Sequence, residues 1–183
     1  MATLELNSRE LSTAARDLSI GDRVYLSGEI YTARDAAHKK MFELLDAGQP
    51  LPFNIAGSCI YYAGPTPAKD GMAVGSCGPT TSGRMDGFSP RLLDLGLKGM
   101  IGKGGRSPSV CDAIVKNSAV YFCATGGAGA LIAKCVKSAT EVAFFELGCE
   151  SLKRLEVERF PLVVAIDAGG RSLFSEGREQ WRR

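Results

Sequence analysis

The sequence has little of several features that often reveal a function. It contains one histidine, a formal net charge of only +2, and no apolar run near the roughly twenty residues that a membrane-spanning helix needs. A single histidine excludes a metal site built from several histidines of this chain. The weak net charge gives no sign of the clustered basic patch that nucleic-acid binding requires. We therefore expect neither a membrane protein nor a nucleic-acid-binding protein.

The first residues also lack the apolar core of a signal peptide, because charged side chains occur throughout residues 1–23. This predicts a cytoplasmic location, where a disulfide framework is not expected. The cysteines are widely spaced and form no CxxC pair, so they predict neither a zinc site nor an iron–sulfur site. We interpret most of them as small buried apolar residues. The six are Cys59, Cys77, Cys111, Cys123, Cys135 and Cys149.

What the chain does have is enough apolar sequence for one packed domain, since 45% of its 183 residues are hydrophobic. Short apolar strands alternate with short helices, which predicts an α/β fold with a covered, mixed sheet. The expected strands are residues 3–7, 24–30, 58–64, 71–78, 98–105, 119–124, 141–147 and 160–168. The expected helices are residues 8–18, 35–46, 88–97, 107–117 and a short one within 125–136. We expect Asp35 and Ser89 to cap two of them, and residues 177–183 to form a solvated basic tail.

Two glycine-rich stretches invite a phosphate-binding interpretation. The stretch GMIGKGGRS does not complete a P-loop, because Gly104 follows Lys103 where Ser or Thr should stand, and Leu97 replaces the first glycine. The stretch TGGAGALIA is a partial dinucleotide fingerprint with Ile132 in place of its third glycine. We interpret it as a tight turn that packs a helix on a strand, with a backbone anion nest as the alternative.

Three cations lie on predicted turns beside helix starts, namely Arg34, Arg84 and Lys103. Helix N-termini favour anions, and arginine binds a carboxylate through two parallel hydrogen bonds. Together the three cations therefore suit a small dicarboxylate. His38 lies one turn after Arg34, and we expect a partly exposed helix residue that could stand behind such a site.

The stretch GPTTSGRMDG places three hydroxyl residues, Thr80, Thr81 and Ser82, next to Arg84. One interpretation is a helix cap, in which a hydroxyl accepts from backbone N–H groups. The other is that a hydroxyl faces a bound acid and takes part in proton transfer. A threonine can do so only where a neighbouring cation lowers its pKa and water is excluded.

Four stretches of the chain resemble the β subunit of the class I fumarate hydratase and L-tartrate dehydratase family of iron–sulfur hydro-lyases. They are GDRVYLSGEIYTARDAAHKKM, IYYAGPTP, GPTTSGRMDGFSPRLLDLGLKGMIGKGG and YFCATGGAGALIAKCVKSA. The resemblance covers about residues 18–174. It implies a swivelling β/β/α domain over residues 21–183 that closes over the substrate, preceded by an N-terminal extension of residues 1–20. It also implies a [4Fe-4S] cluster held by the cysteines of an α partner, with no metal or other cofactor in this chain.

Carried over residue by residue, the resemblance implies that Thr80 is the general base. The substrate carboxylates would be held by Arg34, Arg84 and Lys103. The supporting residues would be Asp35, His38 and Thr81.

The resemblance implies the β subunit of a fumarate hydratase, which interconverts fumarate and malate, with an L-tartrate dehydratase subunit as the alternative. Such a subunit would bind a small dicarboxylate together with its α partner and be inactive alone. The isolated chain could form a homodimer through the surface that the partner would cover. Two hypotheses of other classes stay open: a phosphate- or nucleotide-binding module that uses TGGAGAL and GKGG, and a scaffold subunit without a catalytic role.

Overall fold

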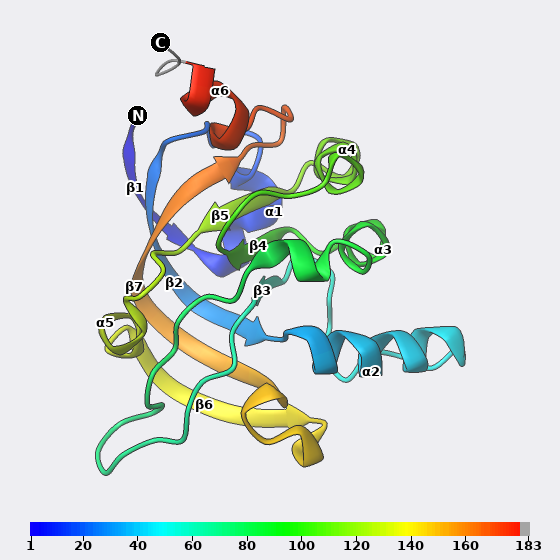
Figure 1. The fold of residues 1–183 in the computed structure, drawn as a ribbon, viewed down its shortest axis with the longest axis vertical. Helices are drawn as coiled ribbons and strands as arrows, with labels where there is room; N and C mark the ends of the chain where they lie inside the picture. The colour runs from blue at the N-terminus through cyan, green and yellow to red at the C-terminus, as the bar shows by residue number, and fades with distance from the viewer. Residues whose placement is uncertain (180–183) are drawn as a thin grey trace.

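The computed structural model describes residues 1–179 of the chain (Figure 1). Two long antiparallel strands organise it, β2 (Arg23–Thr32) and β7 (Leu152–Ile166), and β7 pairs along the whole length of β2. The other edge of β2 is therefore left to two shorter parallel partners. β1 (Thr3–Asn7) pairs with its first half and β3 (Cys59–Tyr61) with its last two residues.

The remaining pairings close a ring of five strands. β3 pairs in parallel with β4 (Gly99–Gly102), and β4 pairs in parallel with β5 (Val120–Cys123). β5 then pairs antiparallel with the end of β7, which returns to β2. β6 (Val136–Ala143) lies outside the ring and pairs with the first half of β7. The mixed sheet and the short helices confirm the predicted α/β fold.

Short helices connect the strands, and Figure 1 shows α2, α3 and α4 together on one side of the sheet. These three are α2 (Asp35–Asp46), α3 (Ser89–Asp94) and α4 (Pro108–Asn117). The smaller helices are η1 (Ser8–Glu10), α1 (Leu11–Ala14), η2 (Ser82–Met85), α5 (Gly129–Ala133), η3 (Phe145–Glu150) and α6 (Leu173–Glu179). Within residues 1–179, no helix is long and apolar enough to cross a bilayer.

The protein has two hydrophobic cores, one on each face of the strands, and the same strands contribute side chains to both. Successive strand side chains point to opposite faces, so a strand that is apolar throughout supplies both cores. Tyr61 and Phe122 belong to a cluster that receives side chains from all five strands of the ring. Their neighbours Ile60 and Tyr121 belong to the second cluster, which includes residues of α2, α3 and α4. The continuous apolar runs in the sequence are explained by this burial on both faces.

Several predicted elements need correction. The stretch 71–78 forms no strand, because its backbone folds back on the same loop: Thr66 N–H donates to the Ser76 carbonyl at 3.0 Å, and Gly75 N–H to the Thr66 carbonyl at 3.0 Å. The strand predicted over 141–147 stops at residue 143, because Phe144 takes a left-handed conformation with φ of 61° and begins the turn into η3.

The caps also differ from the prediction. The N-cap of α2 is Arg34, and Asp35 is already the first helical residue. The N-cap of α3 is Phe88, while the Ser89 hydroxyl donates to the Met85 carbonyl at 2.9 Å. Each predicted cap is thus one residue too late. The predicted basic tail lies partly outside the described residues, since α6 ends at Glu179 and residues 180–183 are not described.

The cysteines are less uniformly buried than the sequence suggested. Only Cys59 and Cys77 are buried, Cys149 is exposed, and the other three are intermediate. The prediction that most of them are buried is therefore wrong. Residues 1–20 supply β1 as well as Leu11, which is fully buried in the first core. The boundary of an N-terminal extension at residue 20 stays a prediction.

Candidate functional site

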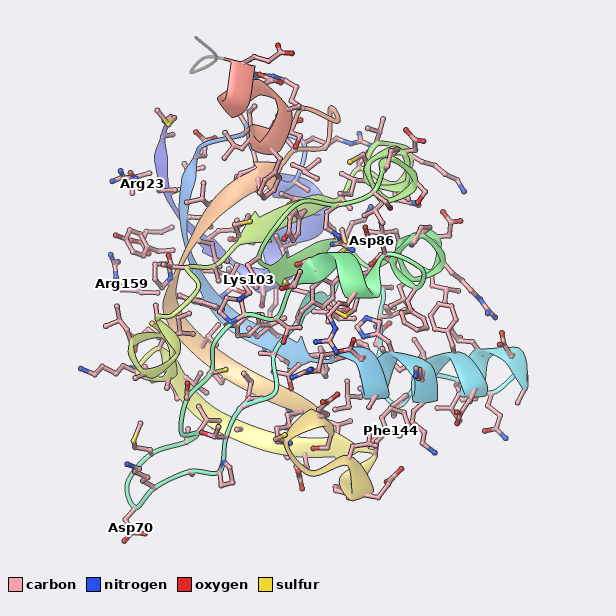
Figure 2. The ribbon with its side chains drawn as sticks, in the orientation of Figure 1. Arg23, Asp70, Asp86, Lys103, Phe144 and Arg159 are labelled. Atoms are coloured by element: carbon pink, nitrogen blue, oxygen red, sulfur yellow. The ribbon has the colours of Figure 1, made fainter. Side chains whose placement is uncertain are left out.

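The candidate residues follow three parallel strands whose carboxyl ends share one edge of the sheet. Arg34 lies two residues after β2, Lys103 comes directly after β4, and Thr80 ends the long connection that follows β3. Ligands of α/β proteins approach at this edge. Figure 2 shows Lys103 at the end of its strand, far from Asp70, which marks the tip of the connection after β3.

Backbone pairing holds the hydroxyl run against Lys103. Thr81 and Lys103 form an isolated parallel bridge, in which Lys103 N–H donates to the Thr80 carbonyl at 3.3 Å and Ser82 N–H donates to the Lys103 carbonyl at 2.9 Å. Thr80 N–H in turn donates to the Tyr62 carbonyl at 2.7 Å. The structure thus brings Thr80, Thr81 and Lys103 together, with Thr80 partly buried and the other two exposed.

The third hydroxyl of the run is buried and has a structural contact. Ser82 Oγ lies 2.8 Å from the hydroxyl of Tyr121, which also donates to the Gly104 carbonyl at 2.8 Å. A Cβ at Gly102 would lie 1.9 Å from Ser82 Oγ, so any side chain there would force Ser82 to move. The predicted helix cap is wrong, because the N-cap of η2 is Thr81 and forms no side-chain cap hydrogen bond.

A buried ion pair joins the segment that follows the hydroxyl run to the loop that follows β4. The sequence analysis missed this pair. The side chain of Arg106 is fully buried, and its Nε donates to Asp86 Oδ1 at 2.7 Å. Asp86 Oδ2 accepts from Ser107 N–H at 2.6 Å, and Arg106 Nη2 donates to Ser89 Oγ at 2.6 Å. In Figure 2, Asp86 lies nearer the helices than Lys103 does. Arg106 lies in the stretch GMIGKGGRS and Asp86 in the stretch GPTTSGRMDG, but nothing in their spacing indicates the pairing.

Two of the three candidate cations meet at one carboxylate. Arg34 Nε donates to Asp35 Oδ2 at 3.2 Å, and Arg84 Nε lies 2.7 Å from Asp35 Oδ1. Partial burial acts to raise the pKa of Asp35. The hydrogen bonds from its own backbone N–H and from Arg34, with the charge of Arg84, outweigh that effect and hold this pKa below its ordinary value.

Glu150 is a second carboxylate in this cluster, and the sequence analysis did not single it out. Its Oε1 lies 3.5 Å from Arg34 Nε, and its Oε2 accepts from Ala36 N–H at 3.3 Å. Ala36 belongs to the first turn of α2, where unpaired N–H groups favour a negative charge. The end of η3 thereby supports the start of α2 across a long sequence separation.

His38 lies behind this cluster, as the sequence suggested, but it is fully buried rather than partly exposed. Its Nδ1 lies 3.0 Å from the Arg34 carbonyl, which can only accept, so Nδ1 carries the hydrogen. Its ring contacts Tyr62 and Phe88, with centroids 5.6 and 5.5 Å away. Burial lowers the pKa of His38 to about 4, so the ring is neutral near pH 7 and supports the backbone of Arg34.

Lys103 stands apart from the arginine cluster. It is exposed, makes no ion pair within residues 1–179, and its Nζ lies 3.9 Å from the position that a Cβ of Gly126 would take. The turn η2 connects Lys103 to the arginine cluster, since Thr81, which pairs with Lys103, precedes it and Arg84 lies within it. The site is therefore a partly open surface with two paired arginines and one unpaired lysine.

The glycine-rich turn before α5 packs against Ser76 and Cys77, in the loop of residues 76–82 that contains the three hydroxyl residues and is called the hydroxyl loop below. Cys77 N–H donates to the Gly129 carbonyl at 3.0 Å, and a Cβ on Gly129 would lie 2.3 Å from Ser76 Oγ. This close approach agrees with the interpretation of the stretch as a packing turn. Within residues 1–179, no three His, Cys, Asp or Glu side chains are grouped so as to hold a metal ion.

Comparison with known proteins identifies the family. The family model described as Fumarase C-terminus matches residues 1–177. Fumarate hydratase 2 of Leishmania major is 42% identical over 159 residues, which cover 86% of this chain and 28% of that enzyme. The aerobic class I fumarate hydratase of Escherichia coli strain K12 is 38% identical over 170 residues, covering 92% of this chain and 31% of that enzyme. The L(+)-tartrate dehydratase subunit beta of the same strain is 36% identical over 169 residues, covering 90% of this chain and 83% of that subunit.

The chain thus spans less than a third of the fumarate hydratases that it matches, and most of the length of the tartrate dehydratase subunit. The family model covers all of the residues that form the ring of strands and the candidate site. The chain belongs to the Fumarase C-terminus family.

Proposed function

We propose that this chain is the β part of an iron–sulfur hydro-lyase, and that it closes over a small dicarboxylate during the reversible addition of water to fumarate to give malate. The observation that carries the proposal is the pair Arg34 and Arg84, joined through one carboxylate beside the loop of Thr80 and Lys103. Two guanidinium groups and one ammonium group provide enough positive charge for both carboxylates of such a substrate.

The cations have a second role in the reaction. When malate loses water, a proton leaves the carbon next to a carboxylate, and negative charge spreads onto that carboxylate. Arg84 or Lys103 at that carboxylate would stabilise the charge as it forms, and Arg34 would hold the other end of the substrate. The neutral His38 fits this arrangement, because it supports Arg34 without adding a charge.

Thr80 is the proposed general base. Thr80 is partly buried, and its main chain pairs with that of Lys103. A positive charge brought to its hydroxyl in the closed complex would favour the deprotonated form. Closure of the domain on a partner would remove water from this surface and strengthen the effect. In the direction of dehydration, Thr80 would take the proton from carbon; in the direction of hydration, it would return it.

The iron–sulfur cluster belongs to the proposed α partner, where it would act as a Lewis acid toward the substrate hydroxyl. The described residues of this chain offer no ligand set for it. We therefore expect the β part to be inactive without the α part, and the complete enzyme to work in the cytoplasm.

Dehydration of L-tartrate is the second candidate. The similarity that favours it is the 36% identity to a tartrate dehydratase subunit beta over 83% of that subunit. Tartrate carries one hydroxyl more than malate. The roles of Arg34, Arg84, Lys103 and Thr80 would be the same for both acids.

The test is reconstitution of the chain with the α subunit from the same organism, under anaerobic conditions and with the cluster loaded. Fumarate hydration and tartrate dehydration are measured for the mixture and for each subunit alone. Activity on one acid in the mixture only supports the proposal and selects the substrate. A loaded complex that is inactive on both acids contradicts it and favours the scaffold or the phosphate-binding hypothesis.

Arg84→Ala tests the site itself, with Arg91→Ala as the matched control. Arg91 is also an exposed arginine that pairs with an aspartate of α2, but it contacts Asp46 at the far end of that helix. We expect Arg84→Ala to lower kcat/KM by about a hundredfold or more, and Arg91→Ala to leave it unchanged. Equal activity of the two variant complexes would show that Arg84 has no role in the reaction.

A further inference from the structure

Asp35 occupies a position that neither helix capping nor substrate binding explains. It is the first residue of α2, yet its two carboxylate oxygens face arginines from two different loops. Oδ2 accepts from Arg34 Nε at 3.2 Å, while Oδ1 lies 2.7 Å from Nε of Arg84 in η2. A single carboxylate thus links the end of β2 to the hydroxyl loop.

Both of these contacts fall on the Nε side of the guanidinium groups. A guanidinium carries five N–H donors, and its Nη1 and Nη2 groups can bind a second carboxylate while Nε is occupied. Within residues 1–179, the Nη groups of Arg34 and Arg84 donate no side-chain hydrogen bond. The donors needed for a dicarboxylate are therefore left available on both arginines.

Glu150 supports the same arrangement from a third segment. Its Oε1 lies 3.5 Å from Arg34 Nε, and its Oε2 accepts from Ala36 N–H at 3.3 Å. The carboxylate of Glu150 is thereby fixed by the first turn of α2. Two carboxylates thus balance two guanidinium groups within this cluster.

Stability alone is a weak reason for this pairing. The Arg84 side chain is 51% exposed, and ion pairs at that exposure contribute little to folding because water screens them. A long arginine side chain at an exposed turn samples many rotamers, and a contact at Nε restricts that freedom. We therefore expect Asp35 to affect the side-chain conformations of the two arginines more than the stability of the fold.

We propose that Asp35, assisted by Glu150, is a positioning residue that holds Arg34 and Arg84 by their Nε atoms and presents their Nη groups to one dicarboxylate. The inference rests on the proposed function for the identity of the ligand. The geometry of the two arginines can be tested in the chain alone, without that function.

The first experiment uses the complete chain and the variants Asp35→Asn and Asp46→Asn. Asp46 ends the same helix and pairs with Arg91, so its variant removes a comparable ion pair away from the site. The measurement is the nitrogen–proton NMR spectrum of the arginine Nε–H groups, assigned with single Arg→Lys variants. We expect distinct, slowly exchanging signals of Arg34 and Arg84 in the unaltered chain, and both should persist in Asp46→Asn. In Asp35→Asn the Arg84 signal should disappear, whereas the Arg34 signal should shift, because Glu150 still contacts Arg34 Nε. Unchanged signals of both arginines in Asp35→Asn would overturn the proposal.

The second experiment measures kinetics in the reconstituted complex. We expect Asp35→Asn to raise KM for the dicarboxylate about tenfold or more, since misplaced binding groups cost one to two orders of magnitude. The thermal unfolding midpoint should stay close to that of Asp46→Asn. An unchanged KM would overturn the positioning role. If the wild-type complex is inactive while the NMR signals still depend on Asp35, the proposed function fails and the arrangement of the arginines stands.

Discussion

The buried pair of Arg106 and Asp86 should make the junction of the two site loops the most sensitive point of this domain to a single charge deletion. The perturbation is Asp86→Ala. It removes the partner of a guanidinium whose side chain is fully buried, and it also removes the acceptor of Ser107 N–H. The unpaired charge would remain between the rings of Tyr62 and Tyr121, whose centroids lie 5.3 and 5.0 Å from Arg106 Cζ.

The magnitude follows from burial. Removing one partner of a buried pair costs about 3–5 kcal/mol, because the other charge is left without compensation. We take about 4 kcal/mol as the expected loss in the free energy of unfolding of Asp86→Ala. With a urea m-value of about 2 kcal/mol/M, the midpoint should fall by about 2 M. For a chain of this size, the thermal midpoint should fall by about 8–16 °C.

The assay is urea unfolding followed by circular dichroism, with Asp94→Ala as the control. Asp94 also forms an ion pair, with Lys116, but both side chains are well exposed, so this variant should leave the midpoint almost unchanged. The double variant Asp86→Ala/Arg106→Met should recover part of the loss, because it replaces the unpaired charge with an apolar side chain. Equal midpoints for Asp86→Ala and Asp94→Ala would refute the reasoning, as would a double variant less stable than Asp86→Ala.

Three further predictions concern single residues. The unfolded chain binds a proton at His38 near pH 6.5 and the folded chain only near pH 4, so stability is lost as the pH falls through this window. The free energy of unfolding should drop by about 1 kcal/mol between pH 7.5 and 5.5 in urea titrations, and His38→Gln should abolish that dependence. Gly102→Ala forces Ser82 Oγ to move and should cost about 1–3 kcal/mol in the same assay. Gly87→Ala, which meets open space, should cost much less, and similar losses for both would contradict the packing argument. In a thiol titration of the native chain, the exposed Cys149 should react first, whereas the buried Cys59, whose pKa burial raises, should react only on unfolding.

The sequence predicted the regular elements well wherever a local pattern was strong. The helix 35–46 was placed with both ends correct, because its apolar residues repeat with the helical period and a loop follows it. The short strands β3, β4 and β5 were found as continuous apolar runs, which are typical of strands covered on both faces. Only the second half of β7 was predicted, because the strand begins at Leu152 rather than at residue 160. The stretch 71–78 was also predicted as a strand but forms a loop, because Gly75 N–H donates to the Thr66 carbonyl and Thr66 N–H donates to the Ser76 carbonyl.

The candidate site was only partly predictable. Lys103 and Thr80 follow strands and come together because those strands are parallel neighbours, which the pattern of elements implies. The contacts of Glu150 and Arg106 join segments far apart in sequence, and their geometry exists only after the ring has closed. The sequence thus predicts which loops come together, whereas the contacts between individual side chains require the structure.

The closed ring of strands has a consequence for the synthesis of the chain. β2 is made early, but the strand that covers its long free edge, β7, begins only at residue 152. Until the ribosome has released that segment, both β2 and β5 present unpaired backbone groups to other chains, which is a known route to aggregation. Production of this domain should therefore depend more on chaperones, and on slow growth at low temperature, than its finished fold would suggest.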